Sequence, residues 1–352
     1  MDFHNHTRGT YNYNCSALKR WSQRSLTGLV IMLMTFKLFP QVVQEVKDEN
    51  SPEGKTVITW VASMPDKEGK NSKNFISRLG DIVFGEEPAL LVRPVAVAAS
   101  ATSGVWIADQ GKGEIVFAGN GKSSLSSLFN QKEERLSSLA GICVSSGERI
   151  LFTDSGNDKL YVKNGKSFYK QLCDTIQLAQ PTGIAWSSTT DEIWVIETKA
   201  HCISILSSDG IRLRRIGSRG TANGEFNFPT HIWIDGAGRV YITDAMNYRI
   251  QVFDSKGNYI FSFGEQGDAT GYFARPKGVA TDSHGNIYVA DALFNAIQVF
   301  DETGKFLHYF GNQGAERGEF WMPNGIFIDK KDFLYIADSY NSRIQVFKIE
   351  YK

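Results

Sequence analysis

This chain of 352 residues has few cysteines and few prolines, and it has no excess of positive or negative charge. Four cysteines are too few to build a disulfide-held scaffold. Lys and Arg together number 38, as do Asp and Glu, so no general basic field exists to hold nucleic acid. Only nine prolines accompany 33 glycines, a balance that predicts many tight turns. The 42% hydrophobic content is enough for a sizeable core and excludes a wholly disordered chain.

Those glycines belong to an internal repeat, which is clearest in the last third of the chain. Three segments align without a gap: RVYITDAMNYRIQVFD from Arg239, NIYVADALFNAIQVFD from Asn286 and FLYIADSYNSRIQVFK from Phe333. Weaker copies start at Arg93, Leu139 and Gln180. An acidic residue marks the same position in six units: Asp109, Asp154, Glu197, Asp244, Asp291 and Asp338.

Each unit has the pattern of four short strands. In the fifth unit we expect strands at 278–282, 286–290, 297–301 and 305–310, separated by Gly-containing turns. Four-stranded units that recur every 43 to 47 residues are typical of propeller blades. The sequence therefore predicts an all-β, six-bladed β-propeller.

The last unit has only three strands before the chain ends, which would leave an open edge. A further strand pattern, KTVITWVA, lies at 55–62. We expect this N-terminal strand to complete the last blade and close the ring, so that the propeller covers residues 55–352. A short amphipathic helix is predicted at 72–84, with Ser72 as its N-cap.

The N-terminal region divides into three predicted parts. Residues 1–25 form a polar tail that ends in a basic cluster, 26–43 an apolar run, and 44–54 a linker. The apolar run fits a single transmembrane signal-anchor or a signal-peptide helix, and both place the basic tail in the cytoplasm. No small-residue cleavage site follows Phe36, which favours an uncleaved anchor. We therefore expect the propeller to be membrane-anchored outside the cytoplasm, in a periplasmic or extracellular position.

The repeated residues resemble the NHL repeat. The resemblance is carried by RPKGVATD from Arg275, GNIYVAD from Gly285 and NSRIQVF from Asn341, with Gly-rich connectors between units. It covers roughly residues 56–352, and the leading strand and helix look like those of a bacterial subgroup of exported propellers. The resemblance implies a six-bladed propeller that binds another exported or membrane protein. It also extends to propeller lyases, which use several His or acidic residues at the channel.

The repeated acids invite a catalytic or metal interpretation, but repetition in every blade favours a role in the fold. A carboxylate at a strand end can cap the N–H groups of the following turn and pair with a nearby Arg. We expect this structural role for Asp109, Asp154, Glu197, Asp244, Asp291 and Asp338, and we expect no metal and no cofactor.

Specific binding is expected where the blades differ, on the face around the channel mouth. That face receives the residues that lead into each first strand and the turns between the second and third strands. It combines basic and aromatic residues, a mixture that suits a protein partner or a small anionic ligand. The predicted binding face is Arg93, Thr182, His201, His231, Tyr248, Arg275, Lys277, Phe294, Trp321, Asn324 and Tyr340.

His231 is unusual because Gly183, Gly278 and Gly325 occupy the same place in other units. A single imidazole does not make a closed metal site, so catalysis by His231 is only the alternative.

Three functions remain open at this point. The favoured one is a non-enzymatic protein-binding scaffold. A propeller hydrolase or lyase with His231 as base is the first alternative. A cell-wall or polysaccharide binder is the second, and it requires Tyr248, Phe294 and Tyr340 to be exposed together. RNA binding is not expected: the first fifty residues hold six Lys and Arg and four Asp and Glu, which leaves 32 basic against 34 acidic residues in the rest.

Overall fold

The computed structural model describes residues 43–45, 56–65, 89–100, 102–119, 125–129, 135–165, 167–172 and 176–352. The predicted tail (1–25), almost all of the predicted anchor (26–43) and the predicted helix (72–84) lie outside these described residues. Within the described ranges, no helix is long and apolar enough to cross a bilayer.

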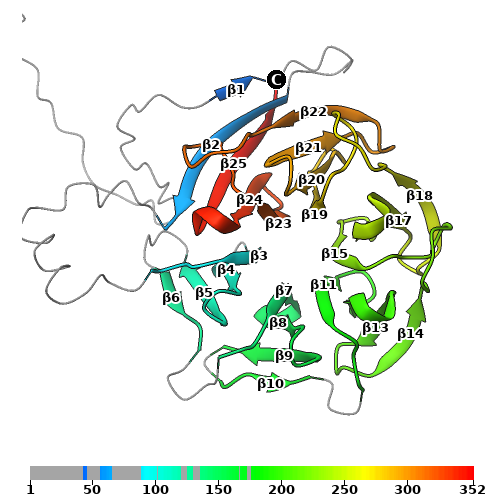
Figure 1. Cartoon of the computed structure of the whole chain (residues 1–352). Helices are drawn as coiled ribbons and strands as arrows, with labels where there is room; N and C mark the ends of the chain where they lie inside the picture. Colours follow the sequence, from blue (N-terminus) through cyan, green and yellow to red (C-terminus); the bar gives the residue numbers. More distant parts are fainter. Residues whose placement is uncertain are drawn as a thin grey trace, which may run out of the picture. The chain divides into compact units, whose positions relative to one another are not determined.

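Six antiparallel sheets make up the propeller (Figure 1). Blade 1 contains β3 (Pro94–Ser100), β4 (Gly104–Asp109), β5 (Glu114–Gly119) and β6 (Leu125–Ser127). Blade 2 contains β7 (Leu139–Ser145), β8 (Arg149–Asp154), β9 (Lys159–Asn164) and β10 (Lys170–Gln171). Blade 3 contains β11 (Pro181–Ser187), β12 (Glu192–Glu197), β13 (Cys202–Ser207) and β14 (Arg212–Ile216).

The second half of the ring repeats this pattern. Blade 4 contains β15 (Pro229–Ile234), β16 (Val240–Asp244), β17 (Arg249–Phe253) and β18 (Tyr259–Phe263). Blade 5 contains β19 (Pro276–Thr281), β20 (Ile287–Asp291), β21 (Ala296–Phe300) and β22 (Phe306–Phe310). Blade 6 contains β23 (Pro323–Ile328), β24 (Phe333–Asp338), β25 (Arg343–Tyr351) and, from the other end of the chain, β2 (Thr56–Met64). Short 3₁₀ turns lie at Ser146–Glu148 (η2), Thr198–Ala200 (η3), Ala245–Asn247 (η4) and Ser339–Asn341 (η5).

The first strand of each blade is the inner one and lines the channel (Figure 1). Each inner strand contacts the inner strand of the next blade, and β23 of blade 6 contacts β3 of blade 1, so the ring is closed. The hydrophobic clusters lie between blades: Ile58, Tyr288 and Ile336, for example, belong to one cluster that joins blades 5 and 6. The prediction of an all-β, six-bladed propeller is confirmed.

The ring is closed by two strands from opposite ends of the sequence. Strand β2 completes blade 6, as the sequence predicted, and runs antiparallel to β25 with Thr59 opposite Lys348. The indole Nε1 of Trp60 donates to Oε1 of Gln345 at 3.1 Å, and the guanidinium of Arg317 lies 4.4 Å from the centre of the indole ring. Strand β1 (Val43–Glu45) pairs with the outer edge of β2. It occupies positions that the sequence analysis assigned to the end of the apolar run and the start of the linker, because β2 leaves an edge to which another strand can add.

Tight hairpins connect the outer strands, as expected. At the turn after β21, Oδ1 of Asp301 accepts the backbone N–H groups of Thr303 and Lys305, both at 2.9 Å. Gly304 has a φ of 86°, which a residue without a side chain adopts at little cost. The same Asp-centred turn follows β17, where Asp254 accepts the N–H of Lys256.

The Gly-rich connectors between blades are fixed by buried aromatic rings. A Cβ atom on Gly264 would lie 2.3 Å from the ring of Phe273, which is fully buried. The same pairing recurs one blade earlier and one blade later. The connector glycines therefore serve packing and turn geometry.

Candidate functional site

The channel-mouth face is defined here by two sets of residues: those that lead into the inner strands and those in the turn between the second and third strands of each blade. The two sets share one side of the ring because each inner strand begins opposite the end of the second strand. In blade 5, for example, Pro276 pairs with Asp291.

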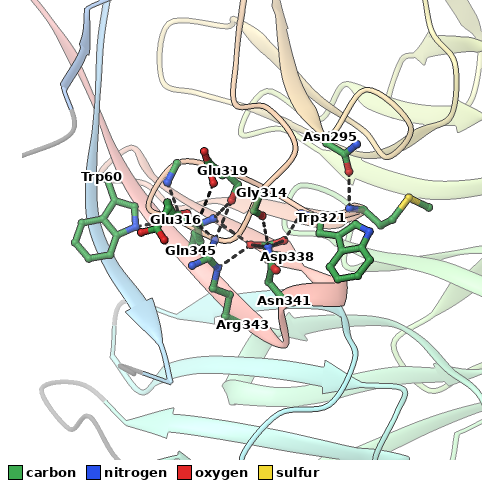
Figure 2. Close-up of polar contacts among 12 residues, drawn as sticks. Trp60, Asn295, Gly314, Glu316, Glu319, Trp321, Asp338, Asn341, Arg343 and Gln345 are labelled. Carbon is green, nitrogen blue, oxygen red and sulfur yellow. Dashed lines mark hydrogen bonds and ion pairs between the residues drawn. The ribbon is translucent and has the colours of Figure 1, made fainter. Parts of the chain in front are cut away.

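The repeated acids are fully buried and hydrogen-bonded, as blade 6 shows (Figure 2). The carboxylate of Asp338 accepts the backbone N–H of Trp321 at 2.8 Å and Nε of Arg343 at 2.7 Å. It also accepts the side-chain amides of Asn341 and Gln345. These contacts tie the connector, the turn and the third strand of the blade together.

The repeated acids of blades 4 and 5 accept hydrogen bonds from related sets of donors. In blade 4, Asp244 accepts from Asn227, Asn247, Arg249 and Gln251 in the equivalent way. In blade 5, Asp291 accepts only backbone N–H groups, because Phe294 and Ala296 stand where blades 4 and 6 have Asn and Arg.

Asp109 and Asp154 cap turns and connectors in blades 1 and 2, and Glu197 pairs with Arg212 and Arg215 in blade 3. All six carboxylates are thus engaged within their own blades. No group of three His, Cys, Asp or Glu residues in the described part of the chain is arranged to hold a metal.

His201 does not belong to the exposed binding face and is a correction to the sequence analysis. Its side chain is buried, its Nδ1 accepts the N–H of Phe228 at 3.1 Å, and its ring packs on the Phe228 ring at 4.5 Å. Asp158 and Asn295 accept the N–H of Gln180 and Met322 in the same way. All six residues have φ between 51° and 57°. We call these three contacts the inter-blade latches, because each joins one blade to the connector of the next.

A ring of side chains surrounds the channel mouth at the second position of each inner strand. Its members are Val95, Ala140, Thr182, Thr230, Lys277 and Asn324. Thr182 shares a 2.7 Å hydrogen bond with the hydroxyl of Thr198, which in turn donates to the carbonyl of Pro229. The polar members therefore gather on blades 3 to 6.

His231 reaches across this mouth. Its Nε2 lies 3.1 Å from Oδ1 of Asn324 in blade 6, and its Nδ1 lies 3.0 Å from the hydroxyl of Thr230. The bond passes the inner strand of blade 5, where Gly278 has no side chain in the equivalent position. Burial, together with the positive charge of Lys277, lowers the pKa of His231 to about 3. The imidazole is therefore neutral at ordinary pH.

Lys277 lies beside His231 and has neither a hydrogen bond nor an ion pair from its ammonium group among the described residues. Burial, with a smaller contribution from Arg275, lowers the pKa of Lys277 to about 8. Arg275 itself is exposed at the rim.

Aromatic rings meet across the channel beyond His231. The rings of Trp233 and Phe327 are 5.4 Å apart in an edge-to-face arrangement, and Nε1 of Trp233 donates to the hydroxyl of Thr281 at 2.9 Å. These contacts join blades 4, 5 and 6 below the mouth.

The tips of the turns between second and third strands carry the most exposed apolar residues of this face. Met246, Leu293 and Tyr340 occupy equivalent positions in blades 4, 5 and 6 and are 52%, 55% and 54% exposed. Trp321 is also exposed and its ring lies 5.6 Å from that of Tyr340. We call these four residues the apolar crescent.

Two residues of the predicted binding face are placed differently. Tyr248 and Phe294 are half-buried, and Tyr248 packs on the hydrophobic cluster between blades 4 and 5. Met246 and Leu293 are exposed although they are not part of the predicted face; Met246, Leu293 and Tyr340 follow one another at intervals of 47 residues, which was a usable signal. Arg93 is exposed at the edge of blade 1.

Comparison with known proteins supports the fold. A family model described as a 6-bladed beta-propeller matches residues 279–352. The virginiamycin B lyase of Staphylococcus aureus superposes with a TM-score of 0.55 at 16% identity, covering 73% of this chain and 95% of that one. An auxiliary nutrient binding protein from Bacteroides thetaiotaomicron gives 0.59 at 14% identity, covering 74% and 70%. A gluconolactonase from Xanthomonas campestris gives 0.57 at 14% identity, covering 74% and 89%. No curated protein matches the sequence. At such low identities, the likeness to solved structures shows the fold alone.

Proposed function

We propose that this chain is a non-enzymatic binding scaffold of the NHL propeller type, which holds a partner protein on its channel-mouth face. We further propose that an N-terminal anchor keeps the propeller on the outer side of the cytoplasmic membrane, where the partner is another exported or membrane protein.

The observation that carries the proposal is the uneven composition of the turn tips. Blades 4, 5 and 6 present Met246, Leu293 and Tyr340, whereas blades 1, 2 and 3 have Gly111, Gly156 and Lys199 at this position. A repeat that served only the fold would carry the same type of residue all round. Clustered, exposed, large apolar side chains are typical of protein interfaces.

The geometry gives less support to the two alternatives. A lyase or hydrolase needs a base, but His231 is a weak one, with its pKa near 3 and both ring nitrogens hydrogen-bonded. The enzymes among the structural neighbours share the fold but only 14–16% of the sequence. The polysaccharide binder required Tyr248, Phe294 and Tyr340 to be exposed together, and of these three only Tyr340 is exposed.

Site-specific photo-crosslinking from the full-length chain in its native membrane tests the scaffold. A photoreactive amino acid at Leu293 or Trp321 should give one discrete adduct. The same group at Ile260 or Tyr309, which are equally exposed but lie on outer strands, should not give that adduct. Adducts that are absent, or identical from all four positions, would refute the proposal.

A triple variant, Met246→Ser, Leu293→Ser and Tyr340→Ser, then links the adduct to the apolar crescent. We expect it to abolish the Trp321 adduct while the midpoint of unfolding stays unchanged, because the three side chains are more than half exposed. An unaffected adduct would assign the binding to another surface.

The proposed location has its own test. A Leu293→Cys variant should react with a membrane-impermeant maleimide in cells whose cytoplasmic membrane is intact. Any outer membrane is first made permeable to the reagent. Labelling that appears only after lysis would place the propeller in the cytoplasm.

A further inference from the structure

The hydrogen-bond donors at the channel mouth can be assigned one by one, because most of them have a fixed acceptor. The Thr198 hydroxyl donates to the Pro229 carbonyl, so the Thr182 hydroxyl must be the donor in the contact between the two threonines. Oδ1 of Asn324 can only accept, so Nε2 of His231 carries the proton in that contact. The neutral imidazole then has Nδ1 as an acceptor, which the Thr230 hydroxyl satisfies.

Three donors remain once these contacts are assigned. They are the ammonium of Lys277, the Nδ2 amide of Asn324 and the guanidinium of Arg275, none of which has a side-chain hydrogen bond or ion pair to another described residue. The His231 contact fixes Oδ1 of Asn324 and thereby the side on which Nδ2 lies. Asp291, which accepts the backbone N–H of Arg275, is fully buried and engaged.

An unpaired, half-buried ammonium is costly to a protein unless it is compensated. The three uncommitted groups are all donors, and two of them are cationic. The complementary ligand is therefore an acceptor with negative charge. The Trp233–Phe327 contact across the channel below limits how deeply such a ligand can enter.

We propose that the channel mouth binds a small oxyanion, a carboxylate or a phosphate, between Lys277 and Asn324, with Arg275 at the rim. Lys277 supplies the charge and Asn324 a directed hydrogen bond. His231 is a positioning residue, since it holds the Asn324 amide in the orientation that presents Nδ2. This site does not depend on the apolar crescent or on any partner protein.

Lysine NMR on the purified full-length chain with ¹³C-methylated lysines tests this site. Sodium phosphate and sodium succinate are titrated separately, against sodium chloride at equal ionic strength. We expect a saturable shift of the Lys277 resonance with at least one of the two anions and only a small, non-saturating change with chloride. The anion that saturates the Lys277 shift at the lower concentration, phosphate or succinate, shows whether phosphate or carboxylate is the preferred group. Absence of saturation with both anions would overturn the proposal.

Matched variants assign the binding to named residues. Lys277→Met should weaken the anion affinity at least tenfold, as followed by the unfolding midpoint against anion concentration, whereas Lys256→Met at an exposed hairpin should leave it unchanged. Because Lys277 is unpaired, its replacement should not lower the midpoint in the absence of anion. An equal anion-dependent rise in midpoint in wild type and Lys277→Met would refute the site.

The positioning role of His231 is tested by a conservative pair. His231→Gln keeps an N–H donor for Oδ1 of Asn324 and should retain affinity within about threefold, whereas His231→Phe should lose at least fivefold. Equal affinities for the two variants would remove His231 from the site. These outcomes are independent of the crosslinking results, so failure here leaves the scaffold proposal untouched, and the reverse also holds.

Discussion

At His231, the fold keeps an ionisable group neutral. An unfolded chain would give this imidazole an ordinary pKa near 6.5, whereas burial and Lys277 lower it to about 3 in the folded state. Between these two values the unfolded state binds one more proton than the folded state. The contribution of His231 to the free energy of unfolding is therefore fully present above about pH 6.5 and decreases as the pH drops toward 3.

This difference predicts a pH-dependent loss that His231→Gln should abolish. Each pH unit below 6.5 costs the wild type up to about 1.4 kcal/mol, so lowering the pH from 7 to 5 should cost it about 2 kcal/mol more than the variant. Urea unfolding at the two pH values measures this. Parallel losses in both proteins would show that His231 titrates normally.

Asp338 illustrates the opposite case, a buried charge that is fully partnered. Asp338→Ala leaves Arg343 and the Trp321 N–H without their acceptor, and we expect it to lower the free energy of unfolding by about 3–5 kcal/mol. Asp301→Ala, at a hairpin turn, should cost only about 1 kcal/mol. Chemical unfolding at pH 7 compares the two, and equal losses would contradict the structural role of Asp338.

The sequence was informative about individual residues in an uneven way. Repetition of the six acids indicated a role in the fold, and the contacts of Asp338 and Asp244 have the form that such a role requires. The sequence could not show that His201 is buried, because a histidine in a turn has the same spacing whether it faces solvent or the next blade. Nor could it show the contact of His231 with Asn324, since only the curvature of the ring brings blades 4 and 6 together.

At the scale of elements, the inter-blade latches explain how consecutive sheets are held in register. Each latch residue accepts an N–H from a residue that lies just before the next inner strand, and both backbones are left-handed. Blade 4 has Tyr248 at the latch position, and Arg275 donates its N–H to Asp291 instead. The joint between blades 4 and 5 therefore depends more on apolar packing.

A latch can be separated into its hydrogen bond and its backbone strain. Asn295→Ala loses the bond to the Met322 N–H and places an alanine at a φ of 52°, so we expect a loss of about 2 kcal/mol. Asn295→Gly loses only the bond and should cost about 1 kcal/mol. Thermal unfolding of both variants measures the difference, and a glycine variant as unstable as the alanine variant would show that the strain is unimportant.

Strands and turns were predictable because their signals are local. In blade 5, every predicted strand is present with ends shifted by at most two residues. The hairpin turns after β17 and β21, which run from Asp254 to Gly257 and from Asp301 to Gly304, are formed. The exposed tips were less predictable. Met246, Leu293 and Tyr340 lie two residues after the repeated acids, and their exposure depends on the 3₁₀ turns and tight turns that follow each second strand.

For the whole molecule, ring closure through β2 is the feature on which the fold depends. Trp60 is half-buried and joins β2 to blade 6 through Gln345 and Arg317. Trp60→Ala should lower the free energy of unfolding by about 2–4 kcal/mol. Trp321→Ala, which changes the same residue type on the apolar crescent, should change it by less than about 0.5 kcal/mol. Similar losses for the two in denaturant titrations would show that closure contributes little.

The pairing of β2 with β25 also has a consequence for synthesis. On the ribosome, β2 is made before the inner strands of all six blades, whereas its neighbour β25 is made after every other described strand, so the other five blades can assemble before this one. Until β25 has been made, the edge of β2 that pairs with it stays open, and an open strand edge can pair with another chain. Blade 6 is therefore the last blade that can form, and the emergence of β25 from the ribosome is the step that allows the ring to close.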